Sequence, residues 1–74
     1  MQKYVIKGTI KNSLLYYAGK HYEMTSAFSA SINQATLYSD PGDAHNMLNV
    51  LEVRFETTFQ IVPVKVTIVE MTSK

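Results

Sequence analysis

The feature that most constrains the fold is an apolar run near the end of the chain, QIVPVKVTIVEM, from Gln60 to Met71. Side chains of an extended backbone alternate between two faces, so apolar residues at every second position predict a strand with one buried face. The alternating apolar residues are Val62, Val64, Val66 and Ile68. Such a strand needs a neighbouring strand and a covering layer, which the earlier residues must supply.

Composition places the chain among folded globular proteins. Its 74 residues are 46% hydrophobic and 18% charged, with a net charge of +1, and we expect one domain over residues 1–74. Without cysteine it has no disulfide and no thiolate metal ligand. No apolar run approaches the ~20 residues that span a bilayer. We therefore expect a cytoplasmic protein with no membrane partner.

Two further strands are predicted near the start. Tyr4 to Lys11 alternates in polarity, and Leu14 to Ala18 is rich in aromatic and branched residues. Asn12 and Ser13 lie between them and are typical turn residues, so we expect a hairpin.

The next segment, residues 20–34, shows no lasting period and is predicted as a loop. A loop of this length in a small domain is usually functional or contains a missed element. Phe28 and Ile32 are expected to turn back toward the core. The short β-prone stretch Ala35 to Tyr38 is predicted as a third strand.

A helix is predicted to follow. Asp40 is a suitable N-cap, Pro41 suits the first helical position, and Asp43 follows in the manner of a capping box. One apolar stripe then recurs with helical spacing, formed by Ala44, Met47, Leu48, Leu51 and Phe55. Residues 51–56 also alternate as a strand would, but the clean continuation of the stripe favours a helix to Phe55.

The predicted fold is α+β, a small antiparallel sheet of three to four strands with one helix packed on one face, in the order β-β-β-α-β. The last strand is expected beside the first, with its valine face from Val62 to Ile68 under Met47, Leu48 and Leu51. Pro63 and Lys65 would then protect a sheet edge or form part of a docking surface.

No catalytic, cofactor or metal site is predicted. His21 and Glu23 could act as a base and its orienting acid, but no nucleophile at recognisable spacing and no glycine-rich loop accompany them. His45 lies beside the helix stripe, and a metal needs three or four converging ligands, which two histidines without cysteine do not supply. We expect a non-enzymatic protein.

A partner surface is predicted on the outer side of the helix, because Val53 falls opposite the core stripe and Val50 lies on its flank. The candidate residues are Asn46, Asn49, Val50, Val53 and Glu56 on the helix and Phe28 in the loop of residues 20–34. The partner would bind the outer side of the helix, this loop, or both. Self-association through the same residues is an alternative. Single exposed valines are also ordinary on protein surfaces.

Nucleic-acid binding is a second hypothesis. Lys7, Lys11 and Lys65 would share the sheet face opposite the helix if the first and last strands are neighbours, and a basic face can hold a phosphate backbone. An uncovered sheet face must be polar in any case, so solubility alone also explains these lysines.

Four segments, YVIKG, LYYAG, ATLYSD leading into DAHNML, and IVPVKVTI, resemble small uncharacterised proteins encoded by bacteriophages and prophages of Gram-positive bacteria. Residues 20–34 are longer than the connection in such proteins. The resemblance implies an accessory protein in the cytoplasm of the bacterial host that binds a host protein, such as a defence nuclease in the manner of an anti-CRISPR protein. It supplies no catalytic residues. Nucleic-acid binding and a homo-oligomeric structural role are the alternatives.

Overall fold

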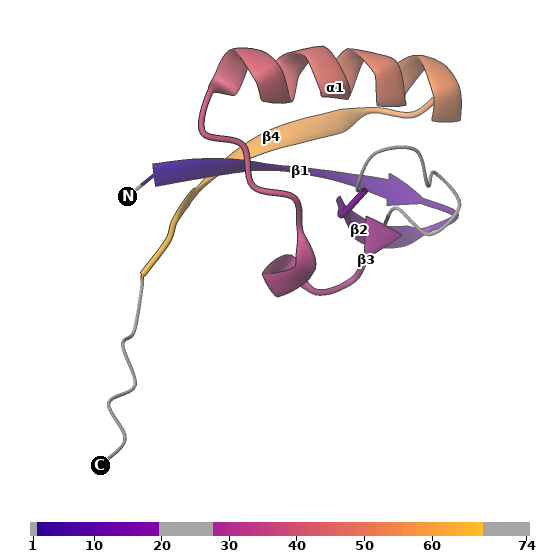
Figure 1. The fold of residues 1–74 in the computed structure, drawn as a ribbon. Helices are drawn as coiled ribbons and strands as arrows, with labels where there is room; N and C mark the ends of the chain where they lie inside the picture. Colours follow the sequence, from indigo (N-terminus) through magenta and orange to yellow (C-terminus); the bar gives the residue numbers. More distant parts are fainter. Residues whose placement is uncertain (1, 20–27, 68–74) are drawn as a thin grey trace.

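A computed structural model describes residues 2–19 and 28–67 and places one helix on one face of a four-stranded antiparallel sheet (Figure 1). The elements are β1 (Gln2–Ile10), β2 (Ser13–Tyr17), β3 (Phe28–Ser29), the 3-10 turn η1 (Ile32–Gln34), α1 (Pro41–Phe55) and β4 (Phe59–Lys65). The strand order is β3-β2-β1-β4. The predicted α+β class, the order of elements and the pairing of the last strand with the first are confirmed.

The third strand is not where it was predicted. β3 lies inside the segment predicted as a loop and pairs with the end of β2. The predicted strand Ala35 to Tyr38 contributes only one bridge, in which the backbone groups of Tyr38 and Tyr4 exchange two hydrogen bonds of 2.9 Å. β2 diverges from β1 before this point, so Tyr38 takes its place beside β1. Residues 20–27 of the predicted loop lie outside the described part of the chain.

The hairpin turn lies one residue earlier than predicted. Ile10 pairs with Ser13, which leaves Lys11 and Asn12 as a two-residue loop, whereas Asn12 and Ser13 were expected there. Both loop residues have positive φ, 52° for Lys11 and 68° for Asn12. A type I′ turn requires this combination, and its twist matches that of the flanking strands.

The helix begins and ends as predicted. Asp40 is the N-cap, and its Oδ1 accepts a hydrogen bond of 3.0 Å from the backbone N–H of Gly42. After Phe55 the chain turns into the left-handed region at Glu56, where φ is 53°, and this stops the helix. The alternative of a strand over residues 51–56 is wrong. Within residues 2–19 and 28–67, no helix is long and apolar enough to cross a membrane.

The core lies between α1 and the sheet. Its buried residues are Ile6, Tyr17, Ala44, Leu48, Leu51 and Phe59, with Tyr4, Ile10, Phe28, Tyr38, Met47, Phe55 and Ile61 packed around them. The predicted helix stripe therefore faces the sheet. Side chains from both central strands and from the helix meet here, so the core depends on contacts between distant parts of the sequence.

The valine face of β4 points away from the helix, which corrects the prediction. Ile6 in the core is directly opposite Ile61, and Val5 is opposite Val62. Residues directly opposite each other on antiparallel strands share a face, so Ile61 lies under α1 and Val62 lies on the other side. Val64 and Val66 share the side of Val62 by alternation. Ile68 lies outside the described residues. The prediction failed because β4 is apolar on both faces, and alternation alone could not choose between them.

The outer edge of β4 is protected, as the position of Pro63 predicted. Tyr4, directly opposite Pro63, gives its backbone hydrogen bonds to Tyr38 on its other side. Pro63 therefore turns its nitrogen, which has no hydrogen, toward the open edge. The backbone N–H of Phe59 also points toward this edge, and it donates a hydrogen bond of 3.0 Å to Glu52 Oε2. Two of the edge donors that another strand would need are absent or already used.

Candidate interaction surfaces

The outer side of α1 carries an exposed apolar pair. Val53 is 80% exposed and Val50 is 52% exposed, one turn apart on the helix. Together with Asn49 and Arg54 they line an open hollow of about 460 Å³. We call these four residues the outer helix surface. Both valines are exposed because the helix stripe that faces the sheet is complete without them.

Of the other residues predicted for this surface, Asn46 and Glu56 are exposed. Asn46 precedes Val50 by one turn and extends the same side of the helix, whereas Glu56 lies past its end.

Phe28 does not belong to the outer helix surface. Its ring is half-buried and lies 5.2 Å from the ring centroid of Phe55, 5.7 Å from that of Tyr17 and 6.0 Å from that of Phe59. Edge-on and offset aromatic pairs of this kind contribute ~0.5–1.5 kcal/mol each beyond their buried area. The prediction that Phe28 turns back to the core is confirmed, and its ring lies apart from the outer helix surface, so its part in a partner surface on the loop stays a prediction. Pairing of β3 with β2 puts the ring on the helix side of the sheet.

The three lysines of the nucleic-acid hypothesis do not share a face. Lys7 is opposite Gln60 and points away from the helix. Lys65 is opposite Gln2, which shares the face of Ile6, and Lys11 lies in the hairpin turn. The prediction required Lys7 and Lys65 to point to the same side of the sheet. The observed pairing of β1 with β4 puts their side chains on opposite sides.

The side of the sheet that faces away from α1 forms a second surface, which we call the open sheet face. Its residues are Lys3, Val5, Lys7 and Thr9 of β1, Leu14 and Tyr16 of β2, and Gln60, Val62 and Val64 of β4. In Figure 1 the single magenta turn of η1 lies on this side, across the sheet from the helix. The segment from η1 to Leu37 covers only part of the face.

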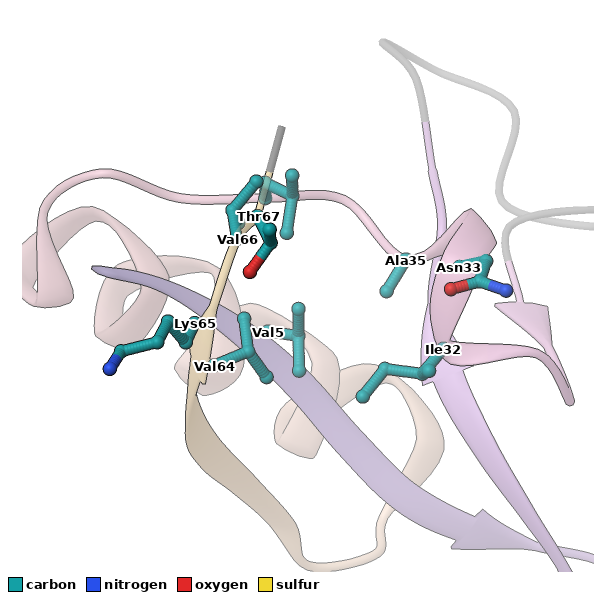
Figure 2. A pocket seen from close by; sticks show the side chains of 9 residues that line it. Val5, Ile32, Asn33, Ala35, Val64, Lys65, Val66 and Thr67 are labelled. Carbon is teal, nitrogen blue, oxygen red and sulfur yellow. The ribbon is translucent and has the colours of Figure 1, made fainter. Parts of the chain in front are cut away.

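A groove of about 270 Å³ runs between η1 and the end of β4. We call it the valine groove, and its apolar lining consists of Val5, Ile32, Ala35, Leu37, Val64 and Val66. Figure 2 shows Val5, Val64 and Ile32 pointing into the same space, while the amine of Lys65 points away from Ile32. Val5 is completely buried, but Ile32 is 43% and Leu37 is 49% exposed.

This groove was not predicted from the sequence, because the valines of β4 were expected under the helix. One signal could have indicated it. The strand reads FQIVPVK, with Phe59 and Ile61 at odd positions and Val62 and Val64 at even ones. Apolar residues at both the odd and the even positions of a strand are typical of a strand that is covered on both faces.

The described carboxylates are confined to one side of the molecule, whereas the basic residues lie on both sides. The described carboxylates, Asp40, Asp43, Glu52 and Glu56, all belong to α1 or its caps. On the open sheet face the charged residues are Lys3 and Lys7. The Lys3 ammonium donates a hydrogen bond of 2.6 Å to the hydroxyl of Ser39. The open sheet face therefore carries two lysines and none of the described carboxylates.

Few groups with special chemistry appear. Within residues 2–19 and 28–67, no three His, Asp or Glu side chains gather closely enough to hold a metal ion. His45 is exposed on the helix, and His21 and Glu23 lie outside the described residues. Burial raises the pKa of Tyr38 to about 12, with smaller contributions from the nearby Tyr17 and Asp43. Tyr38 lies at the junction of β1 and α1, where its backbone pairs with Tyr4 and its side chain packs against the core.

Comparison of the chain with known protein families, with curated proteins and with solved structures finds no match.

Proposed function

We propose that this protein is a non-enzymatic binding module that docks a protein partner through the outer helix surface. The observation that carries the proposal is the 80% exposure of Val53 beside the half-exposed Val50. Burying a valine side chain is worth roughly 1.5–3 kcal/mol, so covering both would supply a substantial part of a binding free energy.

Three properties of this surface favour recognition over chance exposure. The two valines are adjacent on one side of the helix, whereas chance exposure usually scatters apolar residues singly. Asn49 and Arg54 flank them, and arginine with a polar rim is typical of protein interfaces. The helix is capped by Asp40 at its start and packed against the sheet, so little ordering entropy is lost when a partner binds.

The class of partner comes from the resemblance to phage and prophage proteins alone. On that basis the proposed partner is a protein of a bacterial host, such as a defence nuclease that would be inhibited by the binding, and the proposed location is the host cytoplasm. A homo-oligomer that uses the outer helix surface for a second copy is the competing reading.

Affinity capture from a bacterial host lysate tests the proposal with a matched pair of variants. Val50→Ser with Val53→Ser removes the apolar pair, and Leu14→Ser removes an equally exposed leucine, 52% against 52% for Val50, on the opposite side of the sheet. We expect the double variant to retain its partner at least about tenfold more weakly, a change of ~1.4 kcal/mol, and Leu14→Ser to retain it normally. Circular dichroism confirms that all the variants are folded.

Equal capture by both variants would show that the outer helix surface is not the docking site. If light scattering instead shows a dimer that the double variant abolishes, the surface binds a second copy and the homo-oligomeric reading replaces the proposal.

A further inference from the structure

The valine groove lies on the opposite side of the molecule from the outer helix surface. Its floor is formed by Val5 and Val64, and its wall carries the half-exposed side chains of Ile32 and Leu37. A concave apolar site with two exposed aliphatic side chains gains free energy when other aliphatic side chains fill it.

The charges around the groove specify what else the occupant must carry. Lys3 is directly opposite Val64 on the same face, and Lys7 lies four residues farther along β1, on the same face beyond Val5. The Lys3 ammonium is held by the neutral hydroxyl of Ser39, which leaves two of its N–H groups to donate. The four described carboxylates lie on α1 or its caps. A complementary occupant therefore carries negative charge beside its apolar side chains.

Three other kinds of occupant fit less well. In a two-fold dimer formed through this face, the basic face of one copy, with Lys3 and Lys7, would meet the same basic face of the other copy. Like charges repel, so this arrangement is unfavourable. Single-stranded nucleic acid binds on aromatic platforms, whereas the apolar lining of the groove is aliphatic. A strand added at the outer edge of β4 would meet Pro63 and the bonded N–H of Phe59, so the occupant lies on the face of the sheet.

We infer that the valine groove binds an acidic amphipathic segment of another protein. Its aliphatic side chains occupy the space between η1 and β4, and its carboxylates approach Lys3 and Lys7. This site does not depend on the outer helix surface, so either proposal can fail without the other.

Selection of peptides from a random display library on the immobilised full chain tests this inference. We expect the selected peptides to combine Leu, Ile, Val or Phe with Asp or Glu. Their binding should weaken at least about tenfold in Leu37→Asp, which puts a charge on the groove wall at a half-exposed position where the fold tolerates it. The matched control, Val53→Ser on the outer helix surface, should bind the same peptides with unchanged affinity.

A charge reversal then tests the electrostatic part. Lys7→Glu leaves the bond between Lys3 and Ser39 intact, and Lys3→Glu combined with Lys7→Glu reverses the whole basic pair. Selection on the double variant should yield basic amphipathic peptides in place of acidic ones, and the single variant should weaken the acidic peptides by a smaller factor. A thermal melt establishes that each variant is folded.

Four results would overturn the inference. These are selected peptides that lack acidic residues, peptides whose binding is lost in Val53→Ser and kept in Leu37→Asp, and a dimer in light scattering that Leu37→Asp abolishes. The fourth is a chain ended after Thr67 that binds the peptides more than tenfold tighter than the full chain, since this would make residues 68–74 the natural occupant of the groove.

Discussion

Replacement of Gly8 by alanine should destabilise the protein although it adds only one methyl group. Gly8 is directly opposite Phe59 on the helix side of the sheet. A Cβ atom at Gly8 would lie 2.4 Å from Cδ1 and 2.7 Å from Cε1 of the Phe59 ring. Ordinary contacts of a Cβ atom are 3.4–4 Å, so the ring would have to move by about 1 Å.

The size of the effect follows from how tightly the ring is held. Phe59 is only 4% exposed and packs against Phe28 and Phe55, with ring centroids 6.0 and 6.5 Å away. Overpacking of a core costs ~1–3 kcal/mol, and alanine returns ~0.4–1 kcal/mol by restricting the unfolded chain. We expect a net loss of about 1–2 kcal/mol, which lowers the melting temperature of a domain of this size by roughly 4–15 °C.

Urea denaturation followed by circular dichroism measures this loss, and Gly42→Ala is the matched control. A Cβ at Gly42 meets nothing closer than 3.5 Å, and the position lies in the first turn of α1, so this variant should gain ~0.5–1 kcal/mol. In the background of Phe59→Leu, the penalty of Gly8→Ala should shrink by at least about 0.5 kcal/mol, because the two residues are in contact. The steric explanation is wrong if Gly8→Ala is as stable as the original chain. It is also wrong if the loss of stability caused by Gly8→Ala is the same in the Phe59→Leu background.

Two further predictions concern the pH dependence of stability and the hairpin turn. Burial, assisted by Tyr17 and Asp43, raises the pKa of Tyr38 from its ordinary 10 to about 12, so the unfolded state releases its proton first and stability falls as the pH rises from 10 to 12. Urea denaturation across this pH range should show a steeper loss of stability for the original chain than for Tyr38→Phe. Parallel losses in the two proteins would show that ionisation of Tyr38 is not the cause. Replacing the turn residues Lys11 and Asn12, both at positive φ, by Asn and Gly should add about 1 kcal/mol, because Asn-Gly suits a type I′ turn. Lys11→Ala controls for loss of the charge, and an equal gain in that variant would refute the backbone explanation.

The sequence alone determined the elements whose signals are local. The helix from Pro41 to Phe55 could be predicted because its cap, its proline and its apolar stripe all lie between Asp40 and Phe55. The two long strands could also be predicted, although β4 ends at Lys65, earlier than the apolar run that continues to Met71. The exposure of Val53 followed directly from helix geometry. These features depend on the chain's own period and need no knowledge of what packs against it.

Only the tertiary structure decided which face of β4 lies under the helix. Residues on both faces of this strand are apolar, so the register with β1 decides which face lies under the helix. In the observed register the bulky Phe59 lies opposite Gly8, and Ile61 lies opposite Ile6. A shift of one residue exchanges the two faces of a strand. That single choice sends Val62 and Val64 to the open sheet face, separates Lys65 from Lys7 and creates the valine groove, because pairing between distant segments fixes what local alternation leaves undetermined.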